Sequence, residues 1–123
     1  MKKIILIIMC SVVLFAQNGK QIYKNSCKVC HIAKKGKFLS KDEKRKLLAP
    51  PIFGVVKHTK ENYPIKKDFV KFVANYIYNP DIKKAVCKKG AIKKFGLMPA
   101  IGKNLTKEQR IEVSKYIYNI KER

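Results

Sequence analysis

Cys27-Lys28-Val29-Cys30-His31 is the most informative segment of this 123-residue chain. Two cysteines at this spacing can each add a thiol to a vinyl group of a porphyrin, and the histidine that follows can bind the iron. With 4 cysteines and 2 histidines in the chain, the pattern arises by chance in only about two of a thousand shuffled sequences. The segment therefore predicts covalent haem attachment at Cys27 and Cys30, with His31 as an iron ligand.

Three other uses of these residues fit less well. A thioredoxin-like redox pair would lie between a strand and a helix of a βαβ unit, and no alternation of strand and helix patterns follows it. A zinc site could combine Cys27, Cys30, Cys87 and His58, but the last two stand alone, whereas structural zinc usually uses two closely spaced pairs. A disulfide between Cys27 and Cys30 would close too short a loop to stabilise much, and it leaves His31 unexplained.

The N-terminus predicts export. Two lysines are followed by an apolar run over 4–15 and a small residue, Ala16, after which the chain turns polar. The run is shorter than the roughly 20 residues that span a bilayer, so residues 1–16 are predicted to be a cleaved signal peptide rather than a retained anchor. Cys10 would suit a lipoprotein, but the bulky Met9 before it does not. The mature protein is therefore expected in the periplasm.

Residues 17–123 are predicted to form one small domain, because the chain is too short for a second core. A covalently held haem would supply much of the apolar centre that such a chain lacks. Polar and basic residues make 34–46 and 57–67 the linker-like stretches of the sequence.

Helical periodicity accounts for most of the remaining chain. Residues 19–31 are predicted to form a first helix that carries the cysteines, and 66–79 a second, beginning at 66 or 67. Thr106 and Gln109 form a capping-box pattern that begins a last helix. Strand-like alternation is nearly absent, so an all-α domain is predicted.

These patterns resemble the small bacterial class I cytochromes c. The resemblance extends from Gly19 to about Asn119. Four motifs carry it: Gly19-x-x-x-Tyr23 before the two cysteines, Ala49-Pro50-Pro51-Ile52-Phe53-Gly54, Leu97-Met98-Pro99, and Tyr116-Ile117.

The resemblance implies a cytochrome c fold, with three to five helices wrapped around one covalently attached haem. It implies that Gly19 lets the last helix cross closely, and that Tyr23 packs beside the haem. It also implies that the Pro50 carbonyl accepts a hydrogen bond from His31 and that the loop carrying Met98 presents its sulfur to the iron.

Met98 is also the leading candidate for the sixth ligand on the residues alone. Met1 and Met9 lie in the predicted signal peptide, so Met98 is the one thioether of the mature chain. Gly96 and Pro99 constrain the backbone beside it. His/Met ligation keeps the iron six-coordinate without a position for substrate, so electron transfer is predicted rather than catalysis. The alternative is a methionine that fills a gap in the core.

His58 is the competing ligand, and bis-His ligation would lower the potential. A lone histidine in a polar stretch is more often solvated than ligating. The Pro50 carbonyl is the expected partner of the His31 imidazole, because such a bond fixes the tautomer and the orientation. Pro51 would take this role if the loop shifted by one residue, and both prolines could instead form an ordinary turn.

The chain is strongly basic, with 29 Lys and Arg against 8 Asp and Glu and a formal net charge of +21. Most lysines are expected on a solvated face, but so large an excess steers a protein toward acidic partners or an anionic membrane surface. The predicted partners are an acidic reductase, terminal oxidase or peroxidase, together with the haem attachment machinery; export and the haem motif argue against nucleic acid. The expected contact lysines, which should matter more than those in 57–71, are Lys28, Lys34, Lys35, Lys93, Lys94 and Lys103.

Cys87 is the thiol that haem attachment leaves over in an oxidising compartment. A small buried apolar residue is the favoured interpretation. An intermolecular disulfide and a redox-sensitive thiol stay open, because neighbouring lysines would favour the thiolate if the side chain were exposed.

These observations predict a periplasmic monohaem carrier of one electron between respiratory redox complexes, without enzyme activity of its own. The alternative is a haem c electron-transfer subunit of a periplasmic oxidoreductase complex. Both need His31 and Met98, so the motif does not separate them. A large exposed apolar patch would favour the subunit, and a haem edge bordered only by lysines would favour the carrier.

Overall fold

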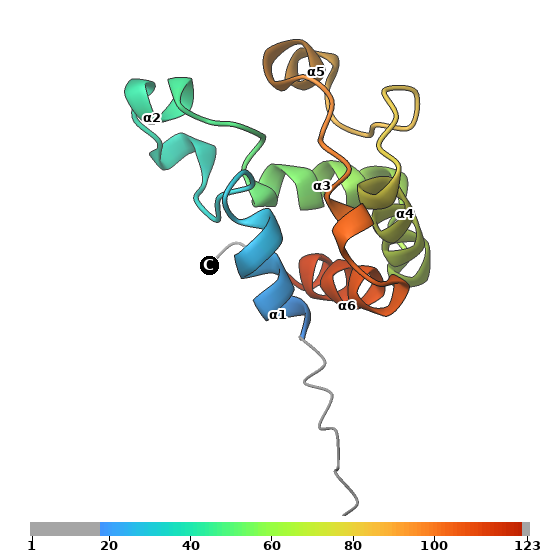
Figure 1. The fold of residues 1–123 in the computed structure, drawn as a ribbon. Helices are drawn as coiled ribbons and strands as arrows, with labels where there is room; N and C mark the ends of the chain where they lie inside the picture. Colours follow the sequence, from blue (N-terminus) through green and yellow to red (C-terminus); the bar gives the residue numbers. More distant parts are fainter. Residues whose placement is uncertain (1–17, 122–123) are drawn as a thin grey trace, which may run out of the picture.

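The computed structural model describes residues 18–121, and every regular element in this part of the chain is helical (Figure 1). The predicted all-α class is confirmed. The predicted signal peptide, 1–16, lies outside the described residues. The α-helices are α1 (Gly19–Ile22), α2 (Lys41–Arg45), α3 (Ile52–Asn62), α4 (Lys66–Tyr78), α5 (Lys89–Phe95) and α6 (Lys107–Tyr118). The shorter elements are a π-helical turn, η1 (Tyr23–Cys27), and the 3-10 turns η2 (Gly36–Phe38) and η3 (Ile101–Asn104).

Helices α1, α4 and α6 pack together and carry most of the buried core (Figure 1). Helix α6 crosses α1 at Gly19, where a β-carbon would lie 2.7 Å from the β-carbon of Tyr116 and would overlap the Glu112 carbonyl oxygen. Any other residue at this position would force the two helices apart. The close crossing that the family resemblance implied is therefore present.

The helix predicted over 19–31 is interrupted. Helix α1 gives way to η1, in which the Lys28 N–H donates to the Tyr23 carbonyl at 2.9 Å in the wider π-helical pattern. A tighter turn follows, and the His31 N–H donates to the Cys27 carbonyl at 2.8 Å. Such π-helical turns are frequent at functional sites, because they re-aim the side chains of one turn.

The two later helix predictions are confirmed. Helix α4 spans Lys66–Tyr78, one residue short of the predicted end. Helix α6 begins at the predicted capping box: the Gln109 N–H donates to the Thr106 hydroxyl at 3.1 Å, and the Thr106 N–H donates to the Gln109 side chain at 2.9 Å. The N–H groups of Thr106 and Gln109 are thereby satisfied at the start of the helix, where no preceding turn supplies carbonyl acceptors.

The described chain has six α-helices rather than three to five. Helix α2 lies within one stretch interpreted as a linker, α3 extends into the other, and α5 lies where no helix was predicted. Residues 57–62 belong to α3, which begins after Pro51 and ends before Tyr63. The interpretation of 57–67 as a linker is therefore wrong over its first half. Within 34–46, the elements η2 and α2 form short helical turns.

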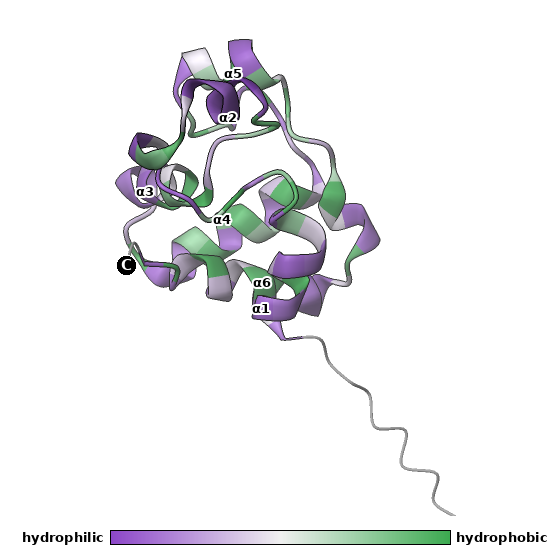
Figure 2. Cartoon of the chain, turned by 90° about the vertical axis from the view of Figure 1, so that its left-hand side faces the viewer, coloured by the Kyte–Doolittle hydropathy of each residue, from purple (hydrophilic) through white to green (hydrophobic). Residues whose placement is uncertain are grey.

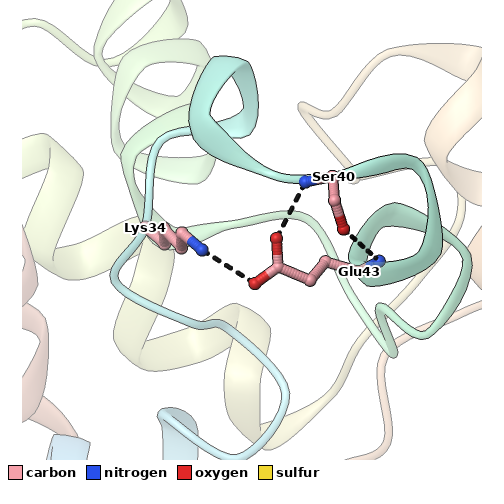
Figure 3. Close-up of polar contacts among 3 residues, drawn as sticks. All are labelled: Lys34, Ser40 and Glu43. Atoms are coloured by element: carbon pink, nitrogen blue, oxygen red, sulfur yellow. Dashed lines mark hydrogen bonds and ion pairs between the residues drawn. The ribbon is translucent and has the colours of Figure 1, made fainter.

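Figure 3 shows why α2 forms in so basic a segment. The Ser40 hydroxyl accepts from the Glu43 N–H at 3.1 Å, and the Glu43 carboxylate accepts from the Ser40 N–H at 2.8 Å and from the Lys34 ammonium at 2.7 Å. The hydrogen bonds from Lys34 and from the Ser40 backbone lower the pKa of Glu43 to about 2, because they favour the charged carboxylate. This second capping box was not predicted, although its spacing is the same as that of Thr106 and Gln109.

Helices α2 and α5 both lie at the end of the molecule away from α1 and α6 (Figure 1), and Figure 2 shows many hydrophilic residues there. The Lys94 ammonium donates to the Lys44 carbonyl at 3.3 Å and joins the two segments. Neither helix contains a buried residue. This end of the fold therefore gains little from packing within the described chain.

Candidate functional site

An open cavity is lined by η1, by α4, by α5 and by the segment that precedes α3. It contains about 1170 Å³ of empty space, a volume that includes the part open to solvent. Most of its lining is apolar, and it includes all four of the predicted attachment and ligand residues: Cys27, Cys30, His31 and Met98. Residues far apart in sequence therefore meet at one cavity.

The two cysteines reach the cavity from η1 and the turn that follows it. Cys27 is buried and Cys30 is half-buried, and both are free thiols. Burial raises the pKa of Cys27 to about 11, because an apolar environment disfavours the thiolate. The two cysteines are not joined in a disulfide, so both thiols are free to add to the vinyl groups of a haem.

His31 is held at two points beside the cysteines. Its Nδ1 lies 2.8 Å from the Pro50 carbonyl oxygen, and because a carbonyl only accepts, Nδ1 carries the proton and Nε2 keeps its lone pair. The Tyr23 hydroxyl donates to the His31 carbonyl at 2.7 Å. Burial lowers the pKa of His31, so the neutral imidazole that a metal needs is favoured.

The two prolines before α3 have different roles. The Pro50 carbonyl accepts from the His31 imidazole, whereas the Pro51 carbonyl accepts from the Gly54 N–H at 3.1 Å and so begins α3. The Ile52 N–H donates to the Ile32 carbonyl at 3.0 Å, which ties this segment to the residue after the histidine. The backbone on both sides of the imidazole contact is therefore anchored.

Met98 reaches the cavity from the loop between α5 and η3, and it is half-buried. Gly96 ends α5 with a φ of 75°, a conformation that favours glycine. After the loop, η3 lies directly on α4: a β-carbon on Gly102 would lie 2.7 Å from the Ile77 carbonyl carbon and from the Tyr78 nitrogen. The methionine loop is thus attached to the packed part of the molecule at one end.

The donor set and the lining fit a covalent haem. Two thiols, an imidazole with an available Nε2 and a thioether share one mostly apolar space, which is the chemistry that a c-type haem requires. Thr59, a polar residue in the wall, is satisfied within α3, because its hydroxyl donates to the Val55 carbonyl at 2.7 Å. The wall around it therefore presents apolar surface to a porphyrin.

Comparison with known proteins agrees with this fit. Residues 15–117 match the family described as cytochrome c oxidase, cbb3-type, subunit III. The chain belongs to this family of c-type cytochromes. An uncharacterized protein of Aquifex aeolicus (strain VF5) is 36% identical over an alignment 133 positions long. The alignment covers 97% of the cytochrome and 88% of that relative. No solved structure matches the chain.

Family membership confirms the resemblance to class I cytochromes c and establishes the cofactor. The cytochrome carries covalently bound haem c, and its function is electron transfer. The single Cys-x-x-Cys-His segment of the sequence provides for one haem.

Two residues considered as alternatives occupy different places in the cytochrome. His58 lies on α3, and not in a loop as its polar surroundings predicted. It is outside the cavity lining, and its Nδ1 lies 3.0 Å from the Glu61 carboxylate. Cys87 is a half-buried free thiol in the cavity wall. Over residues 18–121, no three His, Cys, Asp or Glu side chains gather in a way that could hold a metal ion. The zinc alternative therefore has no support there.

Helix α5 contributes to the cavity wall, which was not predicted from the sequence. Ala91, Ile92 and Phe95 on this helix line the wall, and their spacing is that of one apolar helical face, which a periodicity search can detect. The Tyr23 hydroxyl bond to His31 had no such signal, because it depends on how η1 turns back on the segment after it.

Proposed function

We propose that the cytochrome is a periplasmic carrier of one electron between respiratory redox complexes, with haem attached at Cys27 and Cys30 and axial ligation by His31 and Met98. The observation that carries the proposal is the convergence of these four side chains on one mostly apolar cavity. Because His31 and Met98 would both stay bound, a haem held by these residues would supply one-electron redox chemistry without a change of ligands.

The residues of the chain contribute by keeping the site rigid and dry. Pro50 and Tyr23 hold the His31 ring and its backbone, at 2.8 and 2.7 Å respectively. Phe72 and Ile77 of α4 belong to the apolar wall that excludes water. A site that moves little between oxidation states passes electrons with little reorganisation, so these contacts favour electron transfer over substrate chemistry.

We further propose that acidic redox proteins dock at the open side of the cavity. Leu48 and Leu97 line the cavity and are 64% and 42% exposed, which suits a contact with an apolar centre and a basic surround. Two of the expected contact lysines already have partners: Lys34 pairs with Glu43 at 2.7 Å, and Lys94 donates to the Lys44 carbonyl. An anionic membrane surface would be attracted by the same charge.

The visible spectrum of the purified holoprotein tests the proposed ligation. The ferric protein should show the sulfur-to-iron absorption band, and redox titration should give one reversible one-electron step. A spectrum of bis-His type, or a ferric protein that binds added imidazole as fast as a five-coordinate haem, would overturn it. Fractionation of the native cells tests the periplasmic location.

A bound electron-transfer subunit is the second candidate, because the matched family is described as a subunit of an oxidase. Within residues 18–121, no helix is long and apolar enough to cross a membrane. Native purification in mild detergent separates the candidates: the carrier elutes alone at low molecular mass, and the subunit elutes with its complex.

A further inference from the structure

Three aromatic side chains form a continuous stack along the outer side of the cavity wall. Tyr63 stacks on Phe72 with ring centroids 4.5 Å apart and an interplanar angle of 17°. Phe72 in turn stacks on Tyr76 at 5.5 Å and 25°. Phe72 and Tyr76 lie one helical turn apart on α4, and Tyr63 follows the end of α3.

Phe72 and Tyr76 line two spaces at once. On one side they belong to the wall of the haem cavity, and on the other they line a separate open groove together with Tyr63. The other residues of that groove are polar or charged: Asp68, Lys71, Asn75, Asn79 and Lys84. At this place the wall between the cavity and the outside is therefore made by the same two aromatic side chains.

We propose that this groove on α4 is a second electron-exchange surface, at which an acidic redox protein docks while the open side of the cavity stays accessible to another partner. The inference rests on the proposed electron-carrier function and on covalent haem in the cavity. Electron tunnelling weakens steeply with distance, so a partner in the groove gains from a wall that consists of one layer of side chains.

The charge of the groove selects the partner. Lys71 and Lys84 belong to its lining, and the exposed Lys67 and Lys83 each directly precede a lining residue in sequence. Asp68 is the one carboxylate in the lining. A protein surface with an excess of carboxylates is therefore favoured over a basic one.

The proposed step is a single electron transfer. One electron leaves the reduced donor of the acidic partner and reduces the ferric iron to ferrous, so the donor is oxidised by one electron. No bond forms or breaks and no proton moves. With one partner in the groove and another at the open side, the cytochrome could relay electrons without dissociating from either.

The distance argument is tested on the holoprotein with a ruthenium photoreductant tethered to a single introduced cysteine, in a Cys87→Ser background. Asn75→Cys places the label in the groove. Lys115→Cys is the control, because it lies two residues from the wall residue Ile117 and so on the opposite face of α6. The flash-induced reduction of the haem should be several-fold faster from Asn75→Cys, and equal or slower reduction from that position would overturn the proposal.

The docking argument is tested by the rate at which individual lysines are acetylated in the presence of poly-L-glutamate at low salt. Lys71 and Lys84 should be protected several-fold more than Lys20 and Lys115 on the α1 and α6 side. Equal protection of all four lysines would overturn the proposal, as would protection of Lys71 and Lys84 by phosphatidylglycerol vesicles but not by the polypeptide. A wrong spectrum would refute the proposed ligation, whereas these ratios report only on the groove.

Discussion

The carbonyl oxygen of Pro50 lies 2.8 Å from Nδ1 of His31, so a loop residue 19 positions away orients the imidazole next to the two haem-motif cysteines. Because the carbonyl accepts the Nδ1 proton, Nε2 is the nitrogen left for iron. The same loop begins α3 through the Pro51 carbonyl. The orientation of the His31 imidazole and the start of α3 therefore depend on one short piece of backbone.

Met98→Ala should keep the covalent haem but lose the sulfur-to-iron band and lower the reduction potential, because a thioether ligand stabilises ferrous iron. The vacated position should then bind added imidazole. Absorption spectroscopy and redox titration measure both effects. His58→Ala is the matched control and should change neither, since its ring lies outside the cavity lining. A band that survives in Met98→Ala would make another residue the ligand.

Replacement of both attachment cysteines, Cys27→Ala with Cys30→Ala, should abolish covalent haem and the mature fold together. Helices α2 and α5 have no buried residue of their own, so loss of the cofactor removes most of what they pack against. Circular dichroism and haem staining after denaturing electrophoresis measure the two losses. Cys87→Ala should retain both haem and fold. A colourless double variant with the full helical signal would contradict this prediction.

Gly19→Ala should lower the free energy of unfolding by about 1–3 kcal/mol, because the added methyl group would overlap the α6 backbone. Gly54→Ala is the control within α3: nothing lies within 4 Å of its β-carbon position, so it should raise stability by up to about 1 kcal/mol through helix propensity. Chemical denaturation of both holoproteins measures the difference. Equal effects at the two positions would show that the crossing at Gly19 tolerates a side chain.

The α2 capping box should weaken in acid. The pKa of Glu43 is lowered from 4.5 to about 2 by hydrogen bonds from Lys34 and the Ser40 backbone, so its contribution is complete above pH 4.5 and is lost as the pH falls toward 2. The protection factors of the amides across 40–46, that is, the exchange rates of the unfolded chain relative to those of the folded protein at the same pH, should fall over this range. Glu43→Gln should remove the pH dependence, because the amide keeps an acceptor but does not titrate. Unchanged protection factors in the wild type would show that the box does not hold α2 in solution.

Lysines near the open side of the cavity should control association with an acidic redox partner. Replacing Lys28, Lys93 and Lys103 by glutamate should reduce the second-order electron-transfer rate far more than replacing Lys20, Lys24 and Lys115, with the same change in total charge. The wild-type rate should fall as the Debye length shrinks from about 10 Å at 0.1 M salt to about 3 Å at 1 M. Stopped-flow measurement over a salt series gives the electron-transfer rates of the wild type and both variants. Equal losses of rate in the two variants would mean that only total charge matters, and a rate that does not depend on salt would favour the bound subunit.

Several features could be predicted because their signals are local. The spacing of Cys27, Cys30 and His31 indicated haem attachment, and Thr106 with Gln109 marked the start of α6. These patterns depend on residues within one or two turns of each other, where backbone geometry leaves few alternatives. The covalent haem they indicated agrees with the family match.

The sequence by itself determined the all-α class, the haem motif and the approximate limits of α4 and α6, because periodicity and capping act over short separations. Only the tertiary structure decided that Pro50 rather than Pro51 meets His31, that 57–62 is helical, and that Gly102 lies against α4. It also decided that Phe72 and Tyr76 separate two spaces instead of only filling a core. Each of these depends on contacts between distant segments, whose geometry is set by how whole helices pack and not by any one stretch of residues.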